Sequence, residues 1–101
     1  MAFLRAAKKD EVPPGSIREF ELDGKTVAVA NVDGKLYAIN NTCLHRGGPL
    51  GQGELEGEVV TCPWHGWQYN VTSGKVMLNP AVGVDTYPVE LRGEDIFVDV
   101  G

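Results

Sequence analysis

Residues 25–40 read KTVAVANVDGKLYAIN, two runs rich in Val, Ala, Ile and Tyr that are separated by Asp33-Gly34. Asp-Gly between two such runs is a strong hairpin signal, because both central residues of the tight turn need a positive φ. Asp23-Gly24 separates Ile17–Leu22 from the first of these runs in the same way. Residues 16–40 are therefore predicted to form a three-stranded meander.

The C-terminal residues repeat this pattern. Thr86–Leu91 and Asp95–Val100 flank Arg92-Gly93-Glu94 and predict a further pair of strands, while Phe3–Ala6 is expected to add an edge strand. No segment has a sustained 3.6-residue period, and the prolines of Val12–Gly15 would break a helix that began before them. The fold class is therefore predicted to be all-β.

Residues 41–80, called the insertion below, have a different composition, rich in Gly and Pro. Short strand candidates lie between these residues at Glu58–Thr61, Trp67–Val71 and Lys75–Met77. We expect a single domain over residues 1–101, in which residues 1–40 and 81–101 form a β framework that carries the insertion.

Charge and hydropathy exclude two classes of partner. The net charge of −5 lies mostly in the C-terminal residues, which argues against nucleic acid because such binding needs a basic stripe. No apolar run approaches the ~18 residues that a membrane span needs, and the N-terminus lacks the apolar stretch of a signal peptide. We therefore expect a soluble, cytoplasmic protein without membrane contact.

The only two Cys and two His of the chain all lie between residues 43 and 65. They form the pairs Cys43-Leu-His45 and Cys62-Pro-Trp-His65. Thiolate and imidazole together select Zn, Fe or Cu. Two pairs can close one tetrahedral metal or hold two irons bridged by sulfide, and spacing alone does not choose between these. Zinc fingers usually pair Cys with Cys, so the alternating order suits a centre with both Cys on one iron and both His on the other.

The motif C-x-H followed by C-P-W-H-G-W resembles the Rieske cluster signature, and the likeness extends over the whole chain. It is closest to the small ferredoxins of bacterial aromatic-ring-hydroxylating dioxygenase systems. The resemblance implies a Rieske-type β-sandwich or barrel framework with a loop-rich cluster-binding subdomain, and one [2Fe–2S] cluster per chain. It implies that Cys43 and Cys62 bind the inner ferric iron and that His45 and His65 bind the outer iron near solvent. A third loop, Met77–Pro80, would cover the cluster.

Departures from the respiratory members of this family are also informative. Gly48 and Trp64 stand where those members have two further Cys that form a disulfide, and Trp67 stands where they have a Ser that hydrogen-bonds a cluster sulfide. The tuning hydroxyl of Tyr69 is present. Rieske potentials span about −150 to +300 mV, and the missing Ser predicts a value toward the low end. Trp64 and Trp67 are expected to pack in the core beneath the loops.

A Rieske centre has no open coordination position, and no His remains here for the second iron of an oxygenase. The chain also lacks any flavin- or nicotinamide-binding pattern. We therefore expect an electron carrier, not an enzyme, between a ferredoxin reductase and a terminal oxygenase. Docking is expected near His45 and His65, on a rim of Arg46, Gly47, Pro49, Gly66 and Pro80. The alternatives are a subunit of another redox complex, such as a nitrite-reductase-like one, and a structural zinc module.

Overall fold

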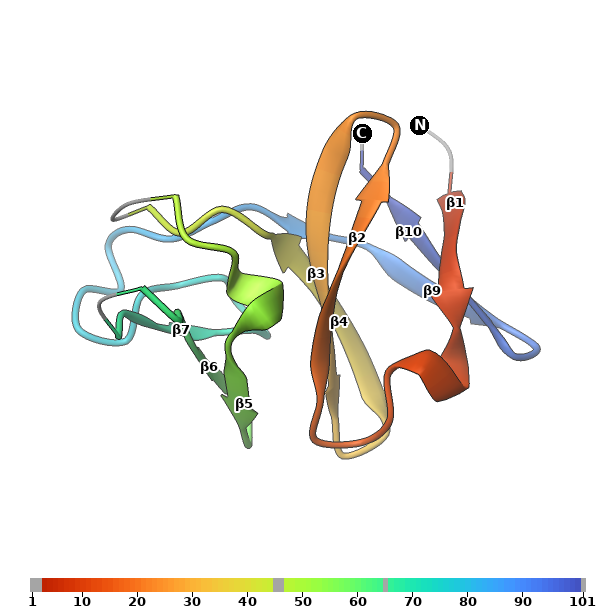
Figure 1. Cartoon of the computed structure of the whole chain (residues 1–101), viewed down its shortest axis with the longest axis horizontal. Coiled ribbons are helices and arrows are strands. Elements are labelled where there is room, and N and C mark those ends of the chain that lie inside the picture. The colour runs from red at the N-terminus through yellow and green to blue at the C-terminus, as the bar shows by residue number, and fades with distance from the viewer. Residues whose placement is uncertain (1–2, 45–46, 65, 101) are drawn as a thin grey trace.

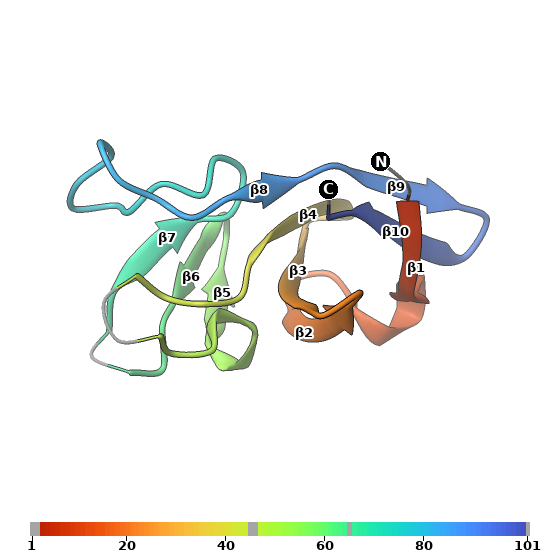
Figure 2. The same cartoon turned by 90° about the horizontal axis from the view of Figure 1, so that it is seen from above.

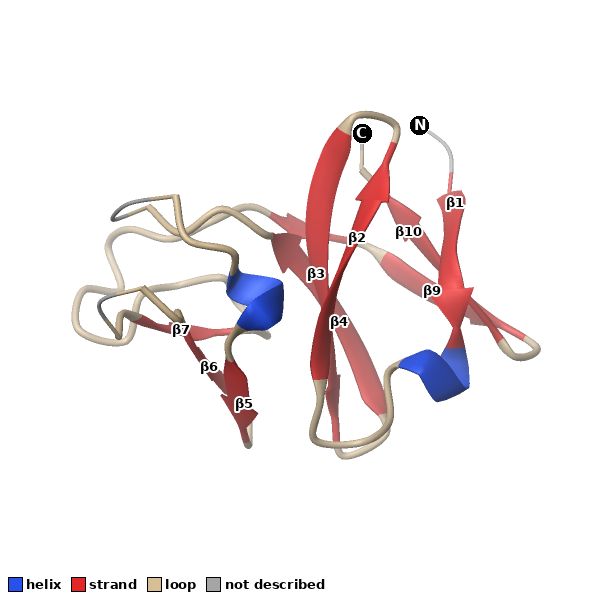
Figure 3. Ribbon diagram, in the orientation of Figure 1, coloured by secondary structure: helices blue, strands red, loops and turns tan. Residues whose placement is uncertain are grey.

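A computed structural model describes residues 3–44, 47–64 and 66–100, in which strands are the main regular structure (Figure 3). The strands are β1 (Phe3–Lys8), β2 (Ile17–Leu22), β3 (Lys25–Val32), β4 (Lys35–Asn40), β5 (Glu54–Glu56), β6 (Val59–Thr61), β7 (Gln68–Asn70), β8 (Thr86–Tyr87), β9 (Val89–Arg92) and β10 (Asp95–Asp99). Single turns of 3-10 helix are present at η1 (Lys9–Glu11) and η2 (Leu50–Gln52). The all-β prediction is confirmed.

The strands form three antiparallel sheets, with the orders β1-β10-β9, β2-β3-β4-β8 and β5-β6-β7. The first two sheets make up the framework, on the right of Figure 1. The third lies within the insertion at the other end of the molecule, and the chain between β7 and β9 runs back along one side to the framework (Figure 2). The loops of the insertion thus project from the end remote from β1 and β10.

Strand β3 is buried on both faces, with Val27, Ala28, Val29 and Ala30 each 0 % exposed. Successive side chains of a strand point to opposite faces, so this strand contributes to two cores. One core lies within the framework and contains Val12, Leu22, Val27, Val29, Ala38, Ile96, Val98 and Val100. The second core joins the framework to the insertion and contains Ile17, Ala28, Ala30, Ile39, Cys43, Leu50, Val60, Cys62, Tyr69, Val71 and Val76.

The predicted meander is present as β2, β3 and β4, and both Asp-Gly turns have the expected backbone. The φ angles are 51° and 79° at Asp23 and Gly24, and 53° and 94° at Asp33 and Gly34. The register pairs Phe20 with Val27 across the first turn and Asn31 with Leu36 across the second. These turns fix which residues of β3 face each core, because a slip of one residue would exchange its two faces.

The C-terminal prediction needs one correction. Thr86–Leu91 is not one strand but two short ones, since β8 pairs with β4 and β9 pairs with β10 on either side of Pro88. Proline has no N–H to give to a sheet ladder, so Pro88 falls where the chain passes from one framework sheet to the other.

The insertion differs from prediction at two places. The observed β6 and β7 lie within the predicted Glu58–Thr61 and Trp67–Val71, but β5 was not predicted. The strand predicted at Lys75–Met77 is wrong, because those residues make only the isolated bridges Tyr69↔Val76 and Lys75↔Gly83.

Within the three described ranges, no helix is both long enough and apolar enough to cross a membrane.

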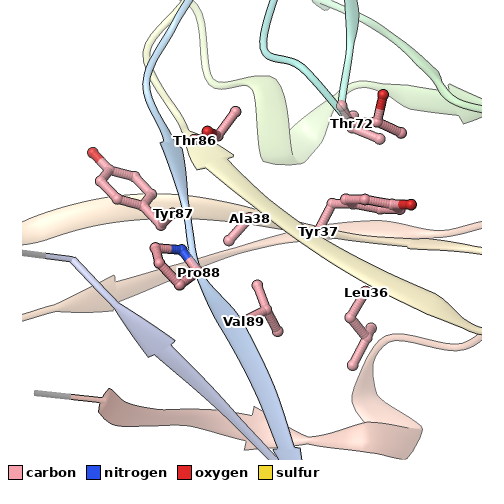
Figure 4. Close-up of a pocket in the computed structure, with 9 residues that line it drawn as sticks. Leu36, Tyr37, Ala38, Thr72, Thr86, Tyr87, Pro88 and Val89 are labelled. Carbon is pink, nitrogen blue, oxygen red and sulfur yellow. The ribbon is translucent and has the colours of Figure 1, made fainter.

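A surface hollow lies beside β4 where the chain leaves β8, which pairs with β4, and enters β9. Tyr37, Thr72, Tyr87 and Pro88 are among its lining residues (Figure 4). Neither cysteine lines it. Burial raises the pKa of Tyr87 above its ordinary value of 10.0, and the negative charge of Asp85 adds to this rise.

The raised pKa of Tyr87 makes stability fall at alkaline pH. The folded chain holds this phenolic proton more tightly than the unfolded chain, so its contribution is complete below pH 10.0 and is lost as the pH rises through the folded pKa. Tyr87→Phe cannot ionise, and its free energy of unfolding should fall less steeply than that of the wild type between about pH 10 and 11.5. Urea titrations across this range measure both slopes, and equal slopes would contradict the expectation.

Candidate metal centre

The first loop of the site runs from β4 to η2 and contains Cys43. It is closed by the bridge Thr42↔Pro49 and by two hydrogen bonds, in which Cys43 N–H donates to the Gly48 carbonyl (2.9 Å) and Gly47 N–H donates to the Cys43 carbonyl (2.8 Å). Gly47 has φ +72°, a conformation that favours glycine. The loop therefore folds tightly back around the Cys43 backbone.

The second loop joins β6 to β7 and contains Cys62. Cys62 N–H donates to the Trp67 carbonyl at 2.7 Å, so the chain returns beside its own starting point. Gly66, with φ +77°, lies just before this closure. Both sequence-predicted cysteines are thus held on short, internally bonded loops.

The structure brings the two thiols to the same buried position. Cys43 is 2 % and Cys62 is 1 % exposed, both belong to the second core, and no disulfide joins them. A Cβ at Gly48 would lie 2.7 Å from Cys62 Sγ and 3.1 Å from the Cβ of Trp64. Gly48 therefore lets the first loop contact the thiol of the second, which is why no larger residue fits there.

The surroundings of these thiols suit a metal ion. Burial raises the pKa of Cys62, the neighbouring Cys43 thiol adds to the rise, and a hydrogen bond with the Trp64 backbone opposes it. Two adjacent buried sulfurs can both be thiolates only beside a strong positive charge, and a soft metal supplies that charge. The donor set therefore fits the thiolate side of an iron–sulfur centre. His45 and His65 lie outside the described residues, as does Arg46, so their places remain predictions.

Tyr69 is fully buried beneath the first loop. Its hydroxyl oxygen lies 3.2 Å from Cys43 Sγ and accepts a hydrogen bond of 2.9 Å from Leu44 N–H. Burial, followed by the adjacent Cys43, raises the pKa of Tyr69, so the phenol keeps its proton. With its oxygen accepting from Leu44, this hydroxyl can donate to a Cys43 thiolate. The tuning hydroxyl expected from the sequence is therefore in contact with the predicted ligand.

A third loop follows β7 and contains Met77–Pro80. It is held by hydrogen bonds from Val76 N–H to the Val82 carbonyl (3.0 Å) and from Val82 N–H to the Asn79 carbonyl (3.1 Å). The three loops lie together at the end of the molecule remote from β1 (Figures 1 and 2). Most of the exposed large apolar side chains among the described residues come from these loops, and we call them the apolar rim: Leu44, Trp64, Met77, Leu78 and Val82.

The sequence located this end of the molecule but not the residues that dominate its surface. Of the predicted rim, Gly47, Gly66 and Pro80 are exposed and Pro49 is partly buried. Trp67 packs against the second core as expected, but Trp64 is 50 % exposed, so the prediction that it packs in the core is wrong. Its side chain begins beside Gly48, where an added Cβ would lie 3.1 Å from both Cβ and Cγ of Trp64, and about half of the residue remains exposed.

A sequence profile of the Rieske [2Fe-2S] domain matches residues 2–88 of this chain. The chain belongs to the Rieske domain family. Such a domain binds a [2Fe–2S] cluster, which agrees with the two buried thiols on facing loops.

Similar proteins indicate which group within the Rieske family this chain is most like. The biphenyl dioxygenase ferredoxin subunit of Pseudomonas sp. (strain KKS102) is 38% identical over 101 residues, covering 98% of this chain and 93% of the relative. The ferredoxin of carbazole 1,9a-dioxygenase from Nocardioides aromaticivorans IC177 superposes with a TM-score of 0.88 at 31% identity and covers 97% of both chains. A chain from a complex of reduced oxygenase and oxidized ferredoxin in carbazole 1,9a-dioxygenase superposes with a TM-score of 0.86 at 32% identity, covering 95% of this chain and 91% of that one. The resemblance to dioxygenase ferredoxins is confirmed.

The Tyr69 hydroxyl should raise the reduction potential of this Rieske domain. Its hydrogen bond to Cys43 Sγ stabilises negative charge, which is greater in the reduced state. Tyr69→Phe should therefore lower the potential by on the order of 60 mV, the equivalent of a tenfold change in a one-electron equilibrium.

Protein-film voltammetry measures this change in the potential. Tyr37→Phe is the matched control: it removes a phenol hydroxyl from β4 at the periphery of the same core, whereas the hydroxyl in contact with Cys43 Sγ is that of Tyr69. A potential unchanged in Tyr69→Phe, or lowered equally in the control, would contradict the assignment.

Proposed function

We propose that this chain carries single electrons from a ferredoxin reductase to the terminal oxygenase of an aromatic-ring dioxygenase system. The observation that carries this proposal is the pair of buried thiols, not joined as a disulfide, at the end of the molecule that bears the apolar rim. Ferredoxin components of dioxygenase systems are its relatives over nearly the whole chain.

The proposed ligands are the thiolates of Cys43 and Cys62 and the imidazoles of His45 and His65, around one cluster in a single domain. In this division residues 41–80 form the cluster-binding part, and residues 1–40 and 81–101 form the framework. When bound, the cluster accepts and releases one electron without an open position for substrate. The chain keeps both thiols away from water and supplies the Tyr69 hydroxyl to Cys43.

Ligation by both cysteines suits a reducing compartment, and a cytoplasmic location is part of the proposal.

Iron and labile-sulfide analysis tests the proposed ligands. The purified wild type should contain two irons and two sulfides per chain, since that is the composition of one [2Fe–2S] cluster. Cys62→Ala and His65→Ala should each lose the visible absorption and both elements, because a two-plus-two ligand set has no spare donor. The control Leu91→Ala, at an exposed position of β9, should keep them. A colourless wild type with one zinc and no sulfide would overturn the assignment in favour of the zinc alternative.

The apolar rim is the proposed docking surface for both redox partners. The three loop segments 41–49, 62–67 and 76–84 contain a single charged residue, Arg46. Leu78 is 95 % exposed, more than any other large apolar side chain among the described residues. Exposed apolar side chains on neighbouring loops are typical of a protein interaction site. Their loops lie at the end of the molecule that contains the two thiols, which would bring a partner's redox centre near the bound cluster.

Leu78→Ser should weaken docking to the terminal oxygenase. Burying a leucine side chain contributes about 1.5–3 kcal/mol, so the apparent affinity should fall about tenfold or more. The loss should persist at high salt, because it arises from apolar burial and not from charge. Electron delivery measured against oxygenase concentration gives this affinity. The exposed Leu91 on β9 provides the control Leu91→Ser, and equal losses in the two variants would place docking elsewhere.

A further inference from the structure

The base of the first ligand loop is held by one buried asparagine. Asn41, 6 % exposed, donates its backbone N–H to the Thr26 carbonyl at 3.1 Å, and its own carbonyl accepts from Leu50 N–H at 2.7 Å. Its side-chain Oδ1 accepts from Gly51 N–H at 2.7 Å. Asn41 thus joins the two ends of the loop that contains Cys43 and connects them to β3.

The side-chain amide nitrogen of Asn41 donates to Glu19, a residue of β2. Asn41 Nδ2 donates to Glu19 Oε2 at 2.7 Å, and Gln52 Nε2 donates to Glu19 Oε1 at 2.7 Å. One carboxylate therefore receives a donor from each end of the ligand loop. Such charge-assisted hydrogen bonds are stronger than neutral ones.

The loop backbone is in close contact with β2 at this point. A Cβ on Gly51 would lie 2.6 Å from Glu19 Cβ and 2.7 Å from the Glu19 backbone nitrogen. Gly51 has no positive φ, so space and not backbone conformation explains the glycine. The distance between loop and strand is therefore fixed by direct contact as well as by the two hydrogen bonds.

We propose that Glu19 is a positioning residue for the cluster, acting through a bridge made by Asn41, Glu19 and Gln52. The bridge fixes the loop that presents Cys43, two residues beyond Asn41, relative to the framework. This inference rests on the proposed ligand role of Cys43. Groups that orient metal ligands through hydrogen bonds typically change metal affinity 10–100-fold when they are replaced.

Two substitutions at Glu19 separate the bridge from the charge. Glu19→Ala removes both acceptors. Glu19→Gln loses the same charge but keeps the bridge, because its oxygen can accept from Asn41 while its amide donates to the exposed Gln52, whose side chain can turn over. Glu19→Ala should release the cluster about 10- to 100-fold faster than the wild type, whereas Glu19→Gln should stay close to it.

The rate is followed as loss of visible absorption in the presence of a chelator, and the electron paramagnetic resonance spectrum of the reduced protein reports the ligand geometry. That spectrum should broaden in Glu19→Ala and not in Glu19→Gln. Equal release rates and equal spectra in the two variants would overturn the proposal. Glu19 would then act through its charge if both variants lost the cluster faster than the wild type, and would have no effect on the cluster if both matched it.

Gln52 gives a second variant that leaves the buried residues untouched. Gln52→Glu places two carboxylates together and should also accelerate cluster loss, while Glu19→Gln combined with Gln52→Glu restores a donor–acceptor pair and should restore the rate. This pair of variants keeps the test decisive if Glu19→Ala does not fold. A double variant no slower than Gln52→Glu alone would count against the bridge.

Asn31 provides the control for general destabilisation. It is 4 % exposed and makes two comparable side-chain hydrogen bonds, to the Val12 carbonyl and from Gly34 N–H, within the framework. Asn31→Ala should lower the melting temperature without hastening cluster loss at 25 °C, whereas Asn41→Ala should do both. If Asn31→Ala and Asn41→Ala accelerated cluster loss equally, the loss would follow from general destabilisation. The bridge through Glu19 would then have a structural role only. A wild type without iron and sulfide would instead refute the proposed function.

Discussion

The burial of β3 on both faces is the constraint on which the rest of the molecule depends. Val27 and Val29 complete the framework core, while Ala28 and Ala30 form a wall of the core that contains Cys43 and Cys62. The same core contains Leu50, where the first loop ends, and Tyr69, whose hydroxyl accepts a hydrogen bond from Leu44 N–H in that loop. The framework and the insertion therefore share one strand, and the loops that contain Cys43 and Cys62 pack on it through this core.

The sequence predicts the framework well because its signals are local. The Asp-Gly turns at residues 23–24 and 33–34 fix β2, β3 and β4 through backbone conformation alone. The insertion was harder to predict, since β5 has only three residues, Glu54–Glu56, and depends on pairing with β6. Lys75–Met77 has strand-like composition, but its partners Tyr69 and Gly83 pair with it only singly.

The residues of the candidate site also divide into those that the sequence predicts and those that it does not. Cys43 and Cys62 are recognisable from their spacing, and Tyr69 from its offset after the second pair. Glu19 and Gly48 are not recognisable, because the contacts that matter are with Asn41 and with the Cys62 thiol, both distant in sequence. Trp64 shows the limit of composition, since a tryptophan in so small a protein is expected inside the core and is half exposed here.

The apolar rim lies at one end of an elongated molecule whose principal extents are 36 × 26 × 20 Å. Under the proposed function both partners dock on this one surface, so reductase and oxygenase would compete for it. Excess oxygenase would then slow the reloading of the carrier, and throughput would depend on how quickly each complex dissociates. Weak binding is therefore a requirement of repeated electron transfer, because a rim that bound either partner too tightly would keep the carrier from reaching the other.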